Sequence, residues 1–226
     1  MLLEEVAGRA AAPAVSAAAR GLRFPQDARI LLASPHGAGT GVYAAPRGDL
    51  DGFGPRGISV AATADRSFAR DLAGAWERPL LDEPADHGIV VPLRLLDTGD
   101  APVVAVAFEE GLDAAAVVDE AKALVAGLDG VRGPVAFVAS ANTSAGLGDA
   151  APLPSLPAAA AADAAALDAL RRDPRLLVPL LPDLAAAGSC AVGPLAALAL
   201  LLGDRPCDVR AYEHPAGVGY AVAATR

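Results

Sequence analysis

The sequence predicts an α/β fold, a three-layer α/β/α sandwich around a mixed, mostly parallel sheet. Short apolar runs of strand length alternate along the chain with longer helical segments. This alternation is typical of folds in which helices cover both faces of a sheet. The 226 residues are enough to form one full hydrophobic core and do not require a second. We therefore expect residues 1–226 to form a single domain.

In the first half of the chain, apolar runs and breaker residues mark each element. Residues 3–21 form an alanine-rich segment that ends at a glycine, and a helix is expected there. The apolar run 28–34 is a predicted strand closed by Pro35, so that His36 falls just past its end. Residues 37–57 are glycine-rich and lack periodicity, which predicts a long loop of the kind that is commonly functional. The next predicted elements are a strand at 58–62, a helix at 67–76, a helix or a strand at 88–96 and a strand at 101–108.

In the second half, residues 113–128 have the pattern of an amphipathic helix, and residues 134–140 that of a buried strand leading into the polar loop 141–146. An alanine-rich helix is expected at 158–170 and a last helix at 190–202. Between them, prolines are expected to break the chain into short pieces, because proline lacks a backbone N–H. These prolines are Pro174, Pro179 and Pro182. Residues 208–213 and 217–224 predict an antiparallel pair at the sheet edge.

Charge and composition exclude several classes of partner. A formal net charge of −9 and an isoelectric point near 4.7 argue against binding to nucleic acid. The most apolar window, 191–202, is too short to cross a bilayer core of roughly 30 Å, so we expect no membrane association. The first residues lack the basic start and the apolar stretch of a signal peptide, and two cysteines make no disulfide framework. These observations predict a cytoplasmic protein that binds a small molecule, alone, as a homo-oligomer or with a partner subunit.

The histidines are the candidate functional residues. His36 follows a predicted strand, and ligands of open α/β folds bind where strands end. His87 opens an apolar segment beside Asp86, an arrangement that suits a positioned acid or base. His214 stands next to Glu213 on a predicted strand. Since neighbouring strand residues point to opposite faces, only one of these last two can face a site.

A mononuclear non-haem iron site needs two imidazoles and one carboxylate, and His36, His87 and Glu213 have these residue types. The alternative, that all three are ordinary surface or loop residues, stays open. A serine hydrolase is disfavoured because no Gly-x-Ser-x-Gly elbow is present, and the glycine-rich segment 37–57 lacks a nucleotide-binding pattern. Cys190, at a predicted helix start, is either an activated thiol or, more commonly, a buried residue.

Five segments in this order resemble the class III extradiol ring-cleavage dioxygenases of the LigB-type superfamily. They are Ser34-Pro35-His36-Gly37, Asp86-His87-Gly88 with its Val-Pro-Leu continuation, the strand 102–106, Ala139-Ser140-Ala141-Asn142 and Gly217-Val218-Gly219-Tyr220. The resemblance implies a non-haem ferrous iron (Fe²⁺) enzyme that opens catechol-like rings with dioxygen. It implies His36 as a metal ligand and His87 as the catalytic residue that orients the substrate. On this basis Ser140 and Asn142 are predicted to bind substrate, and Glu213 is the carboxylate available to the metal.

The chain also departs from the family pattern at three places. A first strand ending in Pro-His-Pro, which supplies a metal histidine in the family, is not found, and the chain begins with what resembles the sequence just after it. Ala145 stands where the family has its acid/base histidine, and residues 188–191 contain no acid. These departures imply either a degenerate dioxygenase, or one completed by a missing strand or a partner subunit. The alternative is a metal-free small-molecule-binding or protein-interaction module of the same fold.

Overall fold

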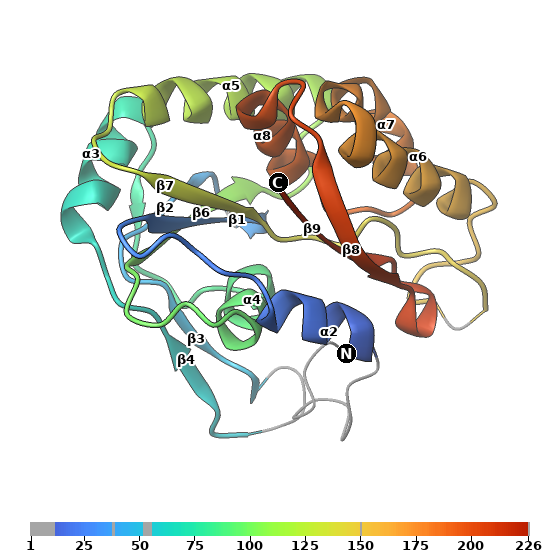
Figure 1. The fold of residues 1–226 in the computed structure, drawn as a ribbon, viewed down its shortest axis with the longest axis horizontal. Helices are drawn as coiled ribbons and strands as arrows, with labels where there is room; N and C mark the ends of the chain where they lie inside the picture. Colours follow the sequence, from blue (N-terminus) through green and yellow to red (C-terminus); the bar gives the residue numbers. More distant parts are fainter. Residues whose placement is uncertain (1–11, 38, 52–55, 150, 226) are drawn as a thin grey trace.

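The computed structural model describes residues 12–37, 39–51, 56–149 and 151–225. They form an α/β structure in which a five-stranded sheet lies between two layers of helices (Figure 1). The strand order is β5-β2-β6-β1-β7. Neighbouring strands are parallel except β2 and β6, which are antiparallel. The sheet is therefore mixed and mostly parallel, and the predicted fold class is confirmed.

The centre of the sheet consists of β1 (Arg29–Gly37) and β6 (Val103–Glu109), with β7 (Val135–Ala139) on the outer side of β1. β1 and β6 are almost wholly buried, as is usual for parallel strands covered on both faces. The short strands β2 (Gly41–Tyr43) and β5 (Leu80–Leu81) complete the sheet beyond β6. Because β1, β6 and β7 are parallel, the segments that follow them emerge at one common edge.

The larger helical layer lies on one face of the sheet (Figure 1). Its helices are α3 (Arg66–Trp76), α5 (Ala114–Asp129), α6 (Ala159–Arg172), α7 (Leu177–Ala186) and α8 (Val192–Leu202), with a single 3-10 turn, η2 (Pro174–Leu176), before α7. Trp76 of α3 packs edge-on against Phe108 of β6, with ring centroids 5.9 Å apart. Burial of such aromatic and aliphatic side chains supplies the main favourable term for folding.

The opposite face carries α2 (Pro13–Arg20) and α4 (His87–Leu95), which contribute to a second apolar cluster. The hairpin of β3 (Arg47–Asp49) and β4 (Ser59–Ala61) lies against α4. A second hairpin, β8 (Cys207–Glu213) and β9 (Tyr220–Thr225), is joined through the 3-10 turn η3 (Pro215–Gly217) and contacts α2 and α6.

Several elements differ from the sequence prediction. β1 continues through His36, which is thus inside the strand rather than past it. The predicted loop 37–57 contains β2 and β3, and the strand predicted at 58–62 pairs with β3 instead of joining the main sheet. The closing strands form a sheet of their own and not the edge of the main one. Strands of three residues are too short to show a period, and pairing partners depend on tertiary contacts.

The prolines of α7 do not break it, contrary to the prediction. Pro179 lies in the first turn of the helix, where a missing N–H leaves no hydrogen bond unmade. Pro182 lies inside, and the fully buried Leu177, Leu181 and Leu184 hold the helix against its neighbours. The helix predicted at 3–21 ends at Gly21 as expected, while residues 3–11 lie outside the described part of the chain.

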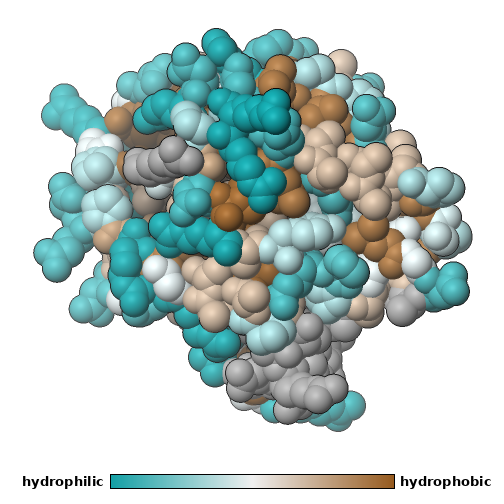
Figure 2. Space-filling model, turned by 45° about the vertical axis from the view of Figure 1, so that its right-hand side comes forward, coloured by the Kyte–Doolittle hydropathy of each residue, from teal (hydrophilic) through white to brown (hydrophobic). Residues whose placement is uncertain are grey.

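The surface in Figure 2 is mainly hydrophilic, with hydrophobic residues in small groups between polar ones. Within the described ranges, no helix has both the length and the apolar character needed to span a bilayer.

Candidate functional site

His36 and His87 lie side by side at the carboxyl end of β1. Their ring centroids are 4.3 Å apart, and the ring planes are inclined by 37°. His36 is the next-to-last residue of β1, and His87 is the first residue of α4, which packs against β1. The two imidazoles, distant in sequence, thus meet at the sheet edge where ligands of open α/β folds bind. We call them the histidine pair.

Asp86 and Ser34 hold this pair in place. Asp86 is the N-cap of α4, and its Oδ1 accepts the N–H of Gly88 at 2.5 Å. The Ser34 hydroxyl lies 3.1 Å from Oδ1 and 3.3 Å from Oδ2 of this carboxylate, to which it donates. The Ser34 oxygen in turn accepts the backbone N–H of His36 at 3.2 Å. The end of β1 is therefore joined to the start of α4 by hydrogen bonds of residues that neighbour the two histidines in sequence.

The glycine of the Asp86-His87-Gly88 motif is required by the close packing of α4 against β1. A Cβ atom at this position would lie 2.3 Å from the Ser34 oxygen and 2.9 Å from Oδ1 of Asp86. Any larger residue would separate the serine from the carboxylate. The glycine is therefore needed for the close approach of α4 to β1, whatever the chemistry of His87.

The environment of His87 lowers its pKa below the ordinary value of 6.5. Desolvation is the main cause, followed by the nearby His36, while Asp86 and Glu110 act in the opposite direction. Its imidazole is consequently neutral at pH 7, with one nitrogen that donates a hydrogen bond and one that accepts.

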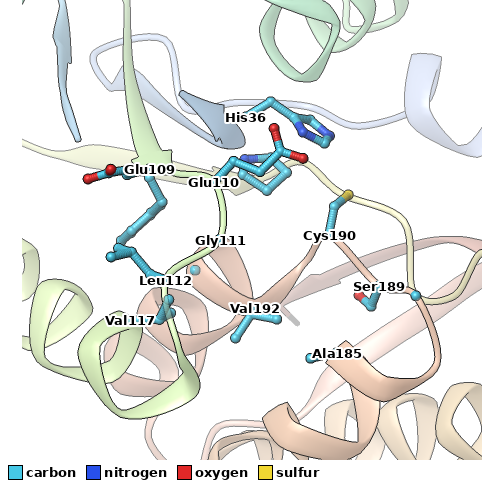
Figure 3. Close-up of a pocket in the computed structure, with 14 residues that line it drawn as sticks. His36, Glu109, Glu110, Gly111, Leu112, Val117, Ala185, Ser189, Cys190 and Val192 are labelled. Carbon is cyan, nitrogen blue, oxygen red and sulfur yellow. The ribbon is translucent and has the colours of Figure 1, made fainter. Parts of the chain in front are cut away.

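A pocket of about 360 Å³ opens beside His36 (Figure 3). Its apolar lining residues include Phe108, Leu112, Val117 and Val192, and its polar lining residues include His36, Glu110, Ser189 and Cys190. In Figure 3, the Glu110 carboxylate and the Cys190 thiol are turned toward His36, whereas Glu109 points away. The volume lies near the lower end of the range of small-molecule sites, about 300–1,000 Å³. The pocket suits a molecule with an apolar body and a polar group at one end.

Asn142 braces the segment that carries Cys190. Its Oδ1 accepts the backbone N–H of Cys190 at 2.8 Å, and its own backbone N–H lies 3.4 Å from the Cys190 sulfur. The Ser189 hydroxyl donates to the Asn142 carbonyl at 2.8 Å. Desolvation by burial is the largest influence on the thiol and raises the pKa of Cys190, although the two backbone N–H groups oppose it. The thiol is therefore protonated at pH 7, which argues against the activated alternative, while Cys190 is half-buried and lines the pocket.

Ser140 directly follows β7, and its backbone N–H donates to the Ala33 carbonyl at 2.9 Å. Its predicted role in substrate binding, and that of Asn142, stay predictions. Ala145 is buried, with 6% of its surface exposed, and its methyl group carries no proton.

Glu213 is engaged elsewhere. Its Oε2 accepts the backbone N–H of Val15 at 2.8 Å, in the first turn of α2. Within the described ranges, no three His, Cys, Asp or Glu side chains come together in a way that could hold a metal ion. The structure thus brings His36 and His87 together without Glu213. The described residues do not fit a ferrous centre of two imidazoles and one carboxylate.

Sequence reasoning missed Glu110, which acts to raise the pKa of His87 and whose carboxylate is turned toward His36 in Figure 3. The signal was present in Glu109-Glu110-Gly111, two carboxylates and a glycine at the end of a buried apolar strand. Acidic residues at the carboxyl end of a central strand are candidates for ligand contact.

A second polar cluster, also missed, lies away from the pocket around Asp163 of α6. This carboxylate is 1% exposed, and its Oδ2 accepts the hydroxyls of Ser144 at 3.0 Å and Tyr212 at 2.5 Å. Its Oδ1 and the Thr143 hydroxyl are buried without a hydrogen-bond partner among the described residues. The cluster connects α6 to β8 and to the loop that follows β7.

The sequence matches no protein-family model, and no curated protein is significantly similar to it. Among solved structures, the fold is similar to that of uncharacterized protein JW3007 from Escherichia coli K12, with a TM-score of 0.60. The match covers 92% of this chain and 89% of that one, at 19% sequence identity. At this identity the similarity shows a shared fold.

Proposed function

We propose that the chain binds a small catechol-like molecule in the pocket beside the histidine pair, and that its fold is that of the extradiol dioxygenase family. The observation that carries this proposal is the pair itself, two imidazoles 4.3 Å apart at the carboxyl end of the sheet, beside a pocket of about 360 Å³. The motifs that resemble the family support the same assignment, because two of them contain these histidines.

The residues of the pocket suit a hydroxylated ring. A neutral imidazole accepts a hydrogen bond from a phenolic hydroxyl through its unprotonated nitrogen. The apolar wall around Phe108 and Val192 offers contact to the ring, and burial of apolar surface contributes about 25 cal/mol per Å². In this proposal His36, which lines the pocket, and His87 beside it bind the hydroxyl groups. Ser140 and Asn142, which are not among the lining residues, contribute from the segment after β7.

Ring cleavage by ferrous iron and dioxygen is the second candidate, and the histidine pair favours it. Iron would supply Lewis-acid and redox chemistry there, with His36 as its ligand. Among the described residues no carboxylate joins the two imidazoles in a group that could hold a metal ion, and Ala145 cannot act as an acid or base. Binding without iron is therefore the function that the geometry supports best.

The test combines iron content with ligand binding. The purified chain is reconstituted anaerobically with ferrous ion, its iron is measured, and catechol binding is followed by calorimetry with and without a chelator. We expect background iron, catechol binding that the chelator does not change, and loss of that binding in His36→Ala. His214→Ala is the matched control, since this histidine lies in the turn after β8 and should leave binding intact.

Two results would decide against this proposal. Stoichiometric iron that falls in His36→Ala, with oxygen uptake on addition of catechol, would establish the dioxygenase instead. Absence of catechol binding under both conditions would remove the ligand assignment altogether.

A further inference from the structure

The charged residues around the pocket are acidic. The described residues that line it include no lysine and no arginine. Glu109 ends the strand β6 and Glu110 follows it, and Asp86 is the N-cap residue that directly precedes His87. The whole chain has a formal net charge of −9. A ligand that brings its own negative charge therefore meets carboxylates without an arginine or lysine to pair with.

Glu110 is the acidic residue best placed to act on a ligand. Its carboxylate is turned toward His36 and Cys190 (Figure 3). It also contributes to raising the pKa of Cys190 and opposes the lowering of the pKa of His87. No ion pair within the described ranges joins Glu110 to an arginine or lysine. Its negative charge is consequently available to a bound molecule.

We infer that the pocket selects its ligand by charge, and that a catechol-like molecule with an ammonium group binds more tightly than one with a carboxylate. This inference rests on the proposed function, since the ligand must occupy the pocket beside His36. An ammonium group gains attraction from Glu110, and a carboxylate in its place suffers repulsion. At the effective dielectric of a partly exposed site, the difference corresponds to about a tenfold ratio of dissociation constants.

The experiment compares three catechols of similar size that differ in charge. Ethylcatechol is neutral, dopamine carries an ammonium group, and dihydrocaffeate carries a carboxylate. Their dissociation constants are measured by calorimetry at low ionic strength, with a chelator present, for the wild type, Glu110→Gln and Glu109→Gln. Glu109→Gln is the matched control, because it removes the same charge from the neighbouring residue, whose carboxylate points away from His36.

We expect dopamine to bind about tenfold more tightly than dihydrocaffeate, with ethylcatechol between them. Glu110→Gln should reduce this ratio to about threefold or less, while Glu109→Gln leaves it close to the wild-type value. Equal binding of all three catechols, tighter binding of dihydrocaffeate, or a ratio unchanged in Glu110→Gln would overturn the charge selection and leave the ligand site standing. Binding of none of them would overturn both this inference and the proposed function.

Discussion

The imidazole of His87 is subject to opposing influences within a few ångströms. Desolvation and His36 lower the pKa of His87. Asp86 and Glu110 raise this pKa by a smaller amount, so the net shift is downward. In the unfolded chain the same group titrates near its ordinary value of about 6.5. As pH falls, the unfolded state therefore takes up this proton first. The contribution to stability is complete above about pH 6.5 and is lost as pH falls toward the lower pKa of the folded state.

The first residue-scale prediction concerns this titration. His36→Ala should raise the pKa of His87, because it removes the electrostatic influence of the neighbouring ring, which lowers this pKa, and admits water to the imidazole. The imidazole proton resonances of His87, followed by NMR as a function of pH, report the change, and His214→Ala should leave the midpoint where it is in the wild type. A pKa of His87 that stays unchanged or falls in His36→Ala would show that the two rings do not interact as described.

A second prediction at this scale concerns Gly88. Gly88→Ala should destabilise the protein by about 1–3 kcal/mol, because its Cβ would collide with the Ser34 hydroxyl and force α4 away from β1. Urea unfolding measures the change. Gly74→Ala, within α3, is the control: a Cβ there meets nothing within 4 Å, and the gain in helix propensity should stabilise by about 0.5–1 kcal/mol. Equal effects of the two substitutions would contradict the close approach.

At the scale of elements, Glu213 connects the β8–β9 hairpin to α2. Its carboxylate satisfies one of the N–H groups that the first turn of a helix leaves without a partner. Glu213→Ala should therefore cost about 1 kcal/mol of unfolding free energy, as the loss of a helix cap does. Catechol binding should not change, because the carboxylate is bound to α2. Asp208→Ala, at an exposed position on the same strand, is the control for stability. Weaker catechol binding in Glu213→Ala would show that Glu213 does take part in ligand binding.

Asp163 connects α6 to β8 and to the loop that follows β7, and its removal is expected to lower the free energy of unfolding more than removal of Glu213 does. Asp163→Ala would leave the buried hydroxyl of Ser144 and the half-buried hydroxyl of Tyr212 without their acceptor, and the free energy of unfolding should fall by about 2–4 kcal/mol. Asp168→Ala on the same helix should change it by less than about 0.5 kcal/mol, because that carboxylate makes an exposed ion pair with Arg172. Thermal or urea unfolding of Asp163→Ala and Asp168→Ala measures the two changes in the free energy of unfolding. Equal losses would mean that the buried carboxylate contributes nothing beyond its place on the helix.

The charge of the whole molecule leads to a prediction about salt. With a net charge of −9, the protein should attract dopamine and repel dihydrocaffeate at low ionic strength. Added salt screens both effects, because the Debye length falls from about 30 Å at 0.01 M to about 10 Å at 0.1 M. Raising ionic strength over this range should weaken dopamine binding and strengthen dihydrocaffeate binding, as calorimetry would show. A change of both dissociation constants in the same direction would indicate that salt alters the folded structure rather than screening the charge interactions with the ligands.

The architecture could be predicted because its central elements are long apolar runs. β1, β6 and the helix α5 were located from their patterns to within a few residues. The short strands β2 and β3 could not be found, since three residues display no period. The partner of the β8–β9 hairpin was missed for a different reason, because its contacts with α2 and α6 join distant parts of the chain.

For the site, the sequence identified both histidines but not their neighbours. The meeting of His36 with His87 follows from the packing of α4 on β1, which no spacing encodes. Glu213 satisfied the residue-type requirement of an iron site, yet its carboxylate binds the N–H of Val15. Residue type can suggest a ligand set, whereas only the fold decides which side chains share a space.

The walls of the pocket come from three separate stretches of chain: the end of β1, the segment from the end of β6 to the start of α5, and the segment from the end of α7 to the start of α8. A ligand bound there contacts all three stretches, so that unfolding of any one of them disrupts the binding site. Binding thus acts on the melting of the protein as a unit, by about 2.7 kcal/mol when free ligand is a hundredfold above its dissociation constant. A compound library screened by melting temperature would consequently report ligands of this pocket before any reaction for them is known.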